Sequence, residues 1–571
     1  MKTAINLLAA ASLISIFGTK AVHAQSIMPA ADGTGTTVTS PSSNPNQFNI
    51  GGGSQTGANL FHSFQEFGLN SNQIANFLST PNIQNILGRV VGGNPSLING
   101  LIQVTGGNSN LYLMNPAGII FGSNASFNLP ASFTATTANR LQIGSDWFNA
   151  TEPNNYANLV GNPSSFAFTT AQPGVIVNAG NLAVNPGESI NLISGNTVNT
   201  GSLSAPGGQI TVSSIPGKSL LRLNQPGNLL SLDIQPTALN DNFSALSLPE
   251  LLTGNQHIRN ATGLQATNGQ VVLPSGTAIP AESGTTIISG NINVANSTPG
   301  KTGGTVQVLG TKVGLVDAAT INASGDAGGG TILVGGDYQG KGSVPNAEFT
   351  FGSQDAVVQA DALTTGNGGK VIFWADNTTR FYGNIFARGG SQSGDGGFVE
   401  TSGAKTLAVD GVTVNTSAPN GHFGTWLLDP TDITVVAGGG LFLYPAVNGA
   451  GVNNTINAST IVTALNGTNV TLTAANSITV NSAIDSSVNA SAGNLVLNAL
   501  TTNLNAPITL FSGSTLSGTA TTVNVASTGK IQNGIDVANP TNATVNVAAG
   551  TYTENLLIPS TKSNFTLAGP F

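Results

Sequence analysis

The chain has 571 residues, a net charge of −8, a charged fraction of 7% and no cysteine. Ordinary soluble proteins carry roughly 25% charged residues, so Glu, Lys and Arg are too scarce here to cover amphipathic helices. The acidic balance also argues against a nucleic-acid partner or electrostatic docking to an anionic membrane, because no basic stripe is available to contact phosphates. The absence of cysteine excludes disulfides, cysteine nucleophiles and thiolate metal sites.

Residues 1–24 have the features of a secretory signal peptide. Lys2 supplies the positive charge, residues 5–17 form the apolar stretch, and residues 22–24 place small or short side chains before the expected cleavage point at Gln25. The apolar stretch is too short for a stable membrane anchor, and no later run approaches transmembrane length. The sequence therefore predicts export through the general secretory machinery, with no integral membrane segment.

A degenerate repeat occupies the middle of the chain. Each unit has a short apolar run, a polar turn, a pair of glycines and a second run with alternating apolar residues. The apolar runs begin at Ile292, Ile321, Val358 and Ile385, and the glycine pairs are Gly303-Gly304, Gly329-Gly330, Gly368-Gly369 and Gly396-Gly397, with an earlier relative at Gly207-Gly208. The spacing is typical of solenoid proteins, in which neighbouring coils must stack to bury their apolar side chains.

This repeat predicts an all-β fold, a right-handed parallel β-helix. A large sandwich is the structural alternative, but hairpin signals are too few for it. We expect the glycine pairs to supply the positive φ angles that sharp corners between strands require.

One stretch, residues 215–256, departs from the repeat. Residues 220–234 read as two strands around Pro226-Gly227. Residues 247–252 read as one helical turn with a Ser N-cap, an early Pro and a stop at Gly254. We expect a small excursion of hairpin and short helix that covers the edge of a coil.

Four short motifs follow one another within residues 49–138. They are FHSFQEF at 61–67, GGNP at 92–95, NLYLMNPAGIIFG at 110–122 and ASFTA at 131–135. In this order behind a signal peptide, the segment resembles the secretion domain of filamentous-haemagglutinin-like two-partner secretion exoproteins. The family usually carries Asn-Pro-Asn-Gly-Ile in the third motif, and Ala117 departs from that pattern.

The third motif contains the residues of a type I turn. Asn115 stands at the first position, Pro116 presets φ at the second and Gly118 stands at the fourth. Ala117 at the third position disfavours a type II turn, which needs a positive φ there. The residues themselves thus predict a structural corner between two apolar strands.

In the family, the matching segment is implicated in secretion competence. The resemblance therefore implies a secretion-signal motif made of Asn94, Pro95, Asn115, Pro116, Gly118 and Ile119. It also implies a signature strand with Phe61, Phe64 and Phe67. The alternative, a turn that only lets the domain fold, stays open, and both roles are compatible.

The domain organisation follows from these patterns. We expect a signal peptide at 1–24, a secretion domain at 25–290, a β-helical repeat region at 291–436 and a further β-solenoid region at 437–571. Residues 424–433 (GTWLLDPTDI) recur in exoproteins of this type and read as a strand that ends in an Asp-Pro turn. Residues 538–567 resemble the opening of a pectin-esterase-like β-helix, and because no cap follows, we expect a truncated sequence.

No histidine pattern indicates a metal or catalytic site. His62, His257 and His422 are far apart in the sequence and lack the spacing of metal ligands. Ordinary polar or half-buried roles are the better interpretation.

The carboxylates give no active-site pattern either. Asp326 and Asp395 lie in glycine-rich turns without the repeated calcium-binding nonapeptide, so we interpret them as turn residues. Asp361, Asp376 and Arg380 form the nearest acidic and basic cluster, and no second carboxylate pair joins it. We predict no enzyme activity, no cofactor and no metal.

The resemblance implies an adhesin-like exoprotein that crosses the outer membrane through a partner, a β-barrel transporter with periplasmic docking domains. Its expected location is extracellular, at the outer surface of a Gram-negative-type bacterium, and its target would be a glycan or protein of a host or cell surface. Two alternatives stay open: a carrier of a contact-dependent toxin whose C-terminus is missing, and a carbohydrate-active β-helix enzyme. Because solenoid contacts are local, the coils can fold one after another as they emerge.

Overall fold

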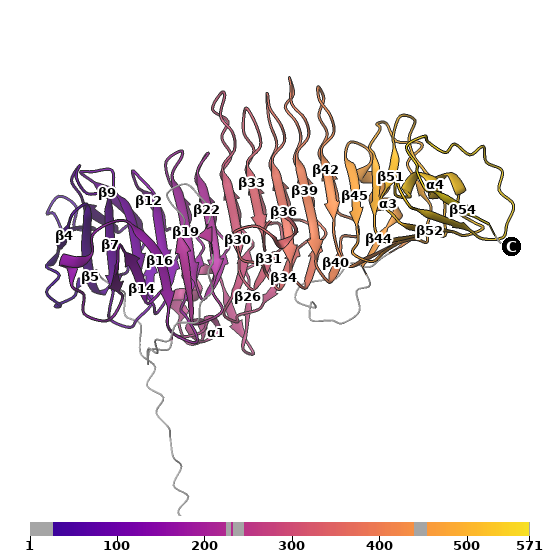
Figure 1. Cartoon of the computed structure of the whole chain (residues 1–571). Coiled ribbons are helices and arrows are strands. Elements are labelled where there is room, and N and C mark those ends of the chain that lie inside the picture. Colours follow the sequence, from indigo (N-terminus) through magenta and orange to yellow (C-terminus); the bar gives the residue numbers. More distant parts are fainter. Residues whose placement is uncertain (1–26, 224–229, 232–244, 439–453, 570–571) are drawn as a thin grey trace, which may run out of the picture.

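The computed structural model describes residues 27–223, 230–231, 245–438 and 454–569, so the predicted signal peptide lies outside the described residues. The described chain winds into an elongated rod of stacked coils (Figure 1). Its strands form long parallel sheets that run across successive coils. The predicted all-β parallel β-helix is confirmed. Within the described ranges, no helix is both long and apolar enough to cross a bilayer.

Three sheets form the faces of most of the rod. Between residues 85 and 415 each coil passes from sheet A to sheet C to sheet B, and sheet A continues into the later coils. Sheet A contains β5 (Asn59–Glu66), β7 (Asn85–Val90), β10 (Asn110–Met114), β13 (Phe133–Thr136), β19 (Ser189–Ser194), β22 (Gln209–Ser214), β30 (Thr305–Leu309), β33 (Thr331–Val334), β36 (Lys370–Ala375), β39 (Phe398–Gly403), β42 (Thr425–Leu428), β45 (Asn469–Thr473), β48 (Leu495–Asn498) and β51 (Leu516–Gly518). Sheet C contains β8 (Ser96–Ile98), β11 (Ile119–Phe121), β17 (Val175–Asn178), β20 (Asn196–Asn199), β28 (Thr285–Ile288), β31 (Lys312–Leu315), β34 (Phe349–Gly352), β37 (Thr378–Phe381) and β40 (Thr406–Ala408). Sheet B contains β3 (Gln47–Gly52), β6 (Ile74–Leu78), β9 (Leu101–Thr105), β12 (Ser126–Asn128), β18 (Asn181–Ala183), β21 (Ser202–Ser204), β29 (Asn291–Asn293), β32 (Thr320–Asn322), β35 (Val357–Gln359), β38 (Asn384–Phe386) and β41 (Thr413–Asn415).

The predicted repeats stack in register. In sheet B the buried column runs through Ile292, Ile321, Val358, Ile385 and Val414. In sheet A the equivalent column runs through Val306, Ile332, Val371, Val399 and Trp426. Like apolar residues therefore lie above one another and form a continuous core along the rod.

The glycine pairs serve a different purpose from the one expected. Gly303 and Gly304 do not have positive φ; instead, a Cβ atom on Gly303 would lie 1.8 Å from the carbonyl oxygen of Ala323. A Cβ atom on Gly304 would lie 2.2 Å from the carbonyl oxygen of Gly208 in the preceding coil. The expectation of positive φ is confirmed at Gly207, with φ of 64°, but was wrong at Gly303 and Gly304. There the constraint is the close approach of stacked backbones rather than the shape of one corner.

The N-terminal end of the rod is closed by antiparallel strands. β1 (Met28–Pro29) and β4 (Ser54–Thr56) both pair antiparallel with β5, and β2 (Thr36–Thr39) pairs antiparallel with β3. These strands use the hydrogen-bonding groups that the first coil would otherwise expose at an open edge.

An antiparallel sheet covers the outside of sheet A near this end. It joins β14 (Arg140–Ile143), β15 (Asp146–Asn149), β16 (Pro163–Phe168), β23 (Ser219–Leu223) and β24 (Leu230–Ser231), and the short helix η1 (Tyr156–Asn158) lies in the connection between β15 and β16. The predicted hairpin is confirmed in β23 and β24, whereas Pro226-Gly227 lies outside the described residues. The first part, residues 140–168, was not predicted, because its short alternating runs resemble those of the coils themselves.

A second excursion covers the outside of sheet C. It contains α1 (Leu248–Leu252), α2 (Gln256–Thr262), β25 (Gln265–Thr267), β26 (Gln270–Val272) and β27 (Ala278–Ile279). Ser247 caps α1 with Glu250 in a capping box, as the predicted helical turn requires. Leu251 and Ile258 pack in one apolar cluster with Val175. The excursion extends past the expected end at residue 256.

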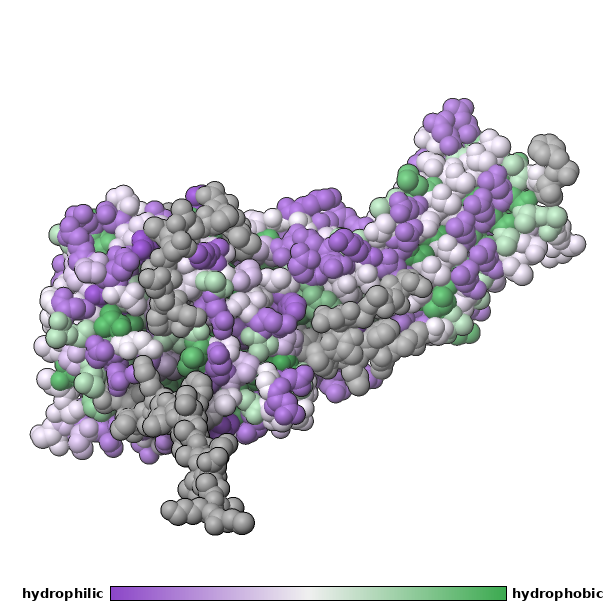
Figure 2. Space-filling view, turned by 90° about the horizontal axis from the view of Figure 1, so that it is seen from below, coloured by the Kyte–Doolittle hydropathy of each residue, from purple (hydrophilic) through white to green (hydrophobic). Residues whose placement is uncertain are grey.

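Beyond residue 431 the rod continues with a changed cross-section. The described elements are β43 (Asp432–Val436), β44 (Thr455–Asn457), α3 (Ala458–Ala464), β46 (Ser477–Val480), β47 (Ile484–Asp485), β49 (Thr501–Leu504), β50 (Ile508–Thr509), β52 (Thr522–Val525), α4 (Ile531–Val537), β53 (Thr544–Val547) and β54 (Thr566–Ala568). β42 ends before Asp429-Pro430, as predicted. Figure 2 shows hydrophobic residues scattered in small groups over one long side of the rod.

Replacing a stacked glycine should unfold the rod at lower urea concentration. We expect Gly304→Ala to destabilise the chain by about 1–3 kcal/mol, because the added methyl group must displace backbone of the adjacent coil. Gly438→Ala is the matched control, since a Cβ atom there meets nothing within 4 Å. Circular dichroism monitors the unfolding of both variants in urea. Equal midpoints would contradict the claim that Gly304 is needed for close stacking of the coils.

Candidate functional site

The segment from Asn115 to Gly118 forms a hydrogen-bonded turn between β10 and β11. The carbonyl oxygen of Asn115 accepts the Gly118 N–H at 3.0 Å, and its Oδ1 accepts the Ala117 N–H at 3.0 Å. Only Gly118 has positive φ, at 125°, and Ala117 does not. This is the predicted corner with Asn bonding its own backbone two residues on.

Asn115 also joins this turn to the Gly-Gly-Asn-Pro segment of the preceding coil. Its Nδ2 donates to the Asn94 carbonyl oxygen at 3.0 Å and to Ser96 Oγ at 3.0 Å. In return, the Ser96 N–H donates to the Gly118 carbonyl oxygen at 3.0 Å. The Asn115 side chain is fully buried, and both of its polar atoms have partners inside the protein.

The structure brings all six residues of the predicted secretion motif to this one corner. Pro95, Pro116, Gly118 and Ile119 are buried, and Asn94 is half-buried with its Nδ2 donating to Glu66 Oε1 at 3.2 Å. A Cβ atom on Gly118 would lie 3.8 Å from Leu251 Cδ1, so α1 covers the corner from outside. The motif is therefore part of the packed interior of the folded domain.

The three phenylalanines of the signature strand are buried on two different sides of sheet A. Phe64 and Phe67 lie inside the rod, with ring centroids 5.1 Å apart. Phe61 points outward and packs under the antiparallel sheet, 5.2 Å from Phe148 and 5.3 Å from Tyr156. Their shared role is to fasten the first coil to the core and to the antiparallel sheet.

His62 lies between these phenylalanines and points into the core. Its ring is 6.2 Å from that of Phe64 and 5.9 Å from that of Phe77. Neither ring nitrogen has a hydrogen-bond partner among the described residues. Burial disfavours the charged imidazolium and lowers the pKa of His62 to about 4.

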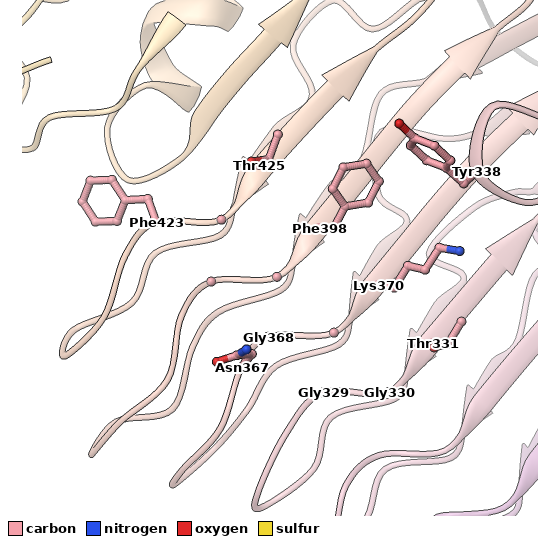
Figure 3. Close-up of a pocket in the computed structure, with 14 residues that line it drawn as sticks. Gly329, Gly330, Thr331, Tyr338, Asn367, Gly368, Lys370, Phe398, Phe423 and Thr425 are labelled. Carbon is pink, nitrogen blue, oxygen red and sulfur yellow. The ribbon is translucent and has the colours of Figure 1, made fainter. Parts of the chain in front are cut away.

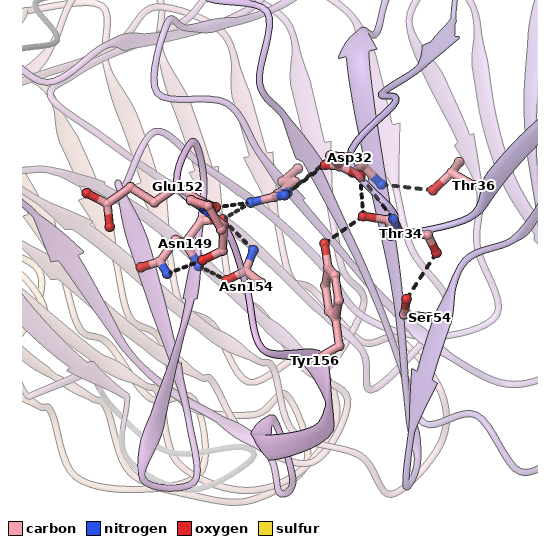
Figure 4. A network of polar contacts seen from close by, with 11 residues as sticks. Asp32, Thr34, Thr36, Ser54, Asn149, Glu152, Asn154 and Tyr156 are labelled. Carbon is pink, nitrogen blue, oxygen red and sulfur yellow. Dashed lines mark hydrogen bonds and ion pairs between the residues drawn. The ribbon is translucent and has the colours of Figure 1, made fainter.

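A polar network centred on Asp32 and Arg89 ties the domain together (Figure 4). Arg89 is 4% exposed and donates to the Asp32 carboxylate at 2.8 Å. Its other nitrogens donate to Ser63 Oγ at 3.0 Å and to the carbonyl oxygens of Asn149 and Glu152 at 2.9 and 2.5 Å. One side chain thus connects the N-terminal strands, the first two coils and the antiparallel sheet.

Asp32 is held in its charged form by the same network. Partial burial alone would raise the pKa of Asp32, but hydrogen bonds from Ser63, Thr34 and Arg89 outweigh it and lower the pKa to about 2. The Thr34 hydroxyl lies 2.7 Å from the Tyr156 hydroxyl, which extends the network to η1. Sequence reasoning missed this site, although a single Arg inside the otherwise uncharged strand β7 was an available signal.

The acidic residues considered earlier do not assemble into a catalytic or metal centre. Asp361 pairs with Arg388 at 2.7 Å, and Asp376 accepts from Trp374 and Asn346, each at 2.9 Å. Thus Asp361 is neutralised by a different arginine from Arg380.

The two turn carboxylates connect neighbouring loops. Asp326 accepts from the Gly300 N–H and the Thr364 hydroxyl at 2.7 Å each, and Asp395 accepts from the His422 N–H at 2.7 Å. The remaining histidine, His257, lies on α2. Over the described ranges, no group of three His, Asp or Glu side chains could hold a metal ion.

Removing the Arg89 side chain should destabilise the domain strongly. We expect Arg89→Met to lower the free energy of unfolding by about 3 kcal/mol, because it leaves the Asp32 carboxylate without its charge partner and the Asn149 and Glu152 carbonyl oxygens without this donor. Arg140→Met is the control, since the Arg140–Glu152 pair is half-exposed on the Glu side and should contribute less than about 1 kcal/mol. Urea denaturation of both variants of the full chain measures the difference.

His62 should make the fold sensitive to acid. Its pKa is depressed in the folded chain, so the unfolded chain binds more protons between about pH 6.5 and pH 4, and the free energy of unfolding falls as pH falls through this window. The loss due to His62 should reach about 3 kcal/mol at the acid end. His62→Leu should remove that component, and superimposable pH profiles of stability for variant and parent would disprove the assignment.

Comparison with known proteins agrees with the expected family. The model of the TPS secretion domain matches residues 27–263. Among solved structures, the crystal structure of the HMW1 secretion domain from Haemophilus influenzae is similar, with a TM-score of 0.37 and 22% identity, covering 71% of this chain and 99% of that chain. No curated protein matches. The family match identifies residues 27–263 as a TPS secretion domain, the N-terminal domain of a two-partner secretion exoprotein.

Proposed function

We propose that this chain is an adhesin-like exoprotein that a partner β-barrel transporter exports across the outer membrane. The secretion domain at residues 27–263 supports this proposal most directly. The transporter's periplasmic docking domains would recognise that domain, and the rest of the rod would be displayed at the cell surface or released. A long, regular rod suits display at a surface.

We further propose that the secretion motif acts through the folded shape of its corner. The Asn115 side chain is 0% exposed, and its amide is used up by Ala117, Asn94 and Ser96. A docking domain that meets the folded chain would therefore contact the outer surface that this corner fixes, including α1, rather than Asn115 itself. The structural role and the secretion role of the motif then have the same physical basis.

The architecture also supports export without an energy source in the periplasm. Each coil contacts its immediate neighbours, so a coil that has emerged can fold on the one before it. Folding outside the cell would then oppose backward movement of the chain through the transporter. The N-terminal cap and the Arg89 network stabilise the first coils, and each later coil can then stack on the coil before it.

Asn115→Ala should reduce both stability and secretion. Loss of the side chain leaves the buried Ala117 N–H, Asn94 carbonyl and Ser96 hydroxyl short of a partner, at a cost of about 1–3 kcal/mol each. With the cognate transporter co-expressed, we expect the fraction of chain in the medium to fall about tenfold and the melting temperature of the purified chain to fall as well. Asn124→Ala, an exposed position in the same coil, is the control.

Two outcomes would count against this proposal. Normal secretion of the Asn115→Ala chain would show that the motif is not needed for export. Lost secretion with an unchanged melting temperature would show that the transporter reads Asn115 directly, before the corner is packed.

A further inference from the structure

A shallow groove crosses sheet A in the middle of the rod, outside the secretion domain (Figure 3). Its volume is about 750 Å3, and it extends over β33, β36, β39 and β42. These four strands lie about 4.8 Å apart, so the groove follows the rod axis for about 14 Å.

The floor of the groove is bare backbone. The stacked pairs Gly329-Gly330, Gly368-Gly369 and Gly396-Gly397 form it, continued by Gly424 in the next coil. These glycines lack side chains because the coils approach closely, with 2.0 Å between a Cβ atom on Gly330 and the Gly304 carbonyl oxygen. A ligand can therefore lie flat against the sheet at this level.

Aromatic rings rise at the sides. Tyr338 and Phe398 are in edge-to-face contact with ring centroids 5.6 Å apart, and Tyr338 is 42% exposed. Phe423 lies on the next coil, and Figure 3 shows its ring on the other side of the glycine strip from Tyr338 and Phe398. Thr331, Asn367 and Thr425 add hydroxyl and amide groups to the lining.

The loop that carries Tyr338 is fastened to the sheet from below. The Gln339 N–H donates to both carboxylate oxygens of Glu400, at 3.3 and 3.2 Å, and its Nε2 donates to Asp429 at 2.6 Å. Glu400 is fully buried, so it anchors the loop without lining the groove. The aromatic wall is thus preorganised before a ligand arrives.

The charge of the groove is balanced. Lys370 is the one lysine or arginine in its lining, and it forms an ion pair with Asp337 at the base of the Tyr338 loop. An anionic ligand would have to compete with that carboxylate. The groove therefore favours a ligand without net charge.

The possible occupants can be narrowed by the way each would bind. A peptide in extended form adds to an open sheet edge, but β33, β36, β39 and β42 are each paired on both sides. An amphipathic helix needs a deep apolar groove, whereas this one has a polar glycine floor. Sugar rings present flat C–H faces that pack on aromatic rings and hydroxyls that bond to backbone, Thr and Asn groups.

We propose that this groove binds a neutral oligosaccharide laid along the rod axis. Its rings would pack on Tyr338, Phe398 and Phe423. Its hydroxyls would donate to glycine carbonyl oxygens and bond to the neighbouring polar side chains, because the glycine N–H groups already donate to other backbone carbonyls. This inference deepens the proposed adhesin role, and binding by the purified chain is independent of export.

The test measures binding by the full chain to cello-, xylo-, manno- and chito-oligosaccharides, first on an array and then by isothermal titration calorimetry. We expect Tyr338→Ala and Phe423→Ala each to raise the Kd of the bound sugar at least about tenfold, because each removes one aromatic ring on which a sugar can stack. Leu500→Ala, at an exposed residue of the distal rod, is the control and should leave the Kd unchanged. Melting curves of both groove variants should match that of the parent chain.

Three results would overturn the proposal: no binding to any neutral oligosaccharide, binding that the groove variants leave unchanged, or a preference for acidic sugars that salt abolishes. The same variants are also assayed for secretion. Export at the parent level together with absent sugar binding would refute the groove and leave the proposed export function intact.

Discussion

The structure depends on one constraint, the in-register stacking of parallel coils at the spacing of strands in a sheet. Each coil between the two ends of the rod pairs its backbone with the coils on both sides, so a residue lies above its counterpart in the repeat. Apolar columns such as the one through Ile332 and Val371 then form one core along the rod. Where the backbones come closest, as at Gly304, no side chain fits. The same spacing explains both the apolar periodicity and the glycine pairs.

Stacking alone leaves the ends and outer faces of a rod unfinished, and the N-terminal part is where this chain departs most from a plain repeat. Antiparallel strands cap the first coil, and two excursions cover the outsides of sheets A and C. The Arg89 side chain, almost wholly buried, joins cap, coil and excursion through one guanidinium group. The secretion domain is thus a β-helix whose outer surface is built from added layers. The residues proposed as its secretion motif lie beneath one of them, at the Asn115 corner.

The middle of the rod shows how the same constraint produces a surface feature. The glycines that permit close stacking also clear a strip of sheet A of side chains, and the loop carrying Tyr338 borders that strip. Glu400 and Asp429 hold the loop in place from beneath. Burial raises the pKa of Glu400 to about 7, although hydrogen bonds from Gln339 and Ser402 oppose that shift. A structural requirement of the repeat has therefore created a groove with fixed walls.

The sequence by itself determined the parallel stack, the turn at Asn115 to Gly118 and the capped helix at Ser247, because each depends on residues close together or on a regular period. Only the tertiary structure decided which side of sheet A each phenylalanine of the signature strand occupies. It alone brought Arg89 to Asp32 and to Glu152, which are 57 and 63 residues away in the sequence. It also showed that the glycine pairs are required because the backbone of the neighbouring coil leaves no room for a side chain. A local sequence pattern determines the conformation of a strand or a turn. The partners of a buried charge, and the close backbone contacts that require glycine, come from segments distant in the sequence that only folding brings together.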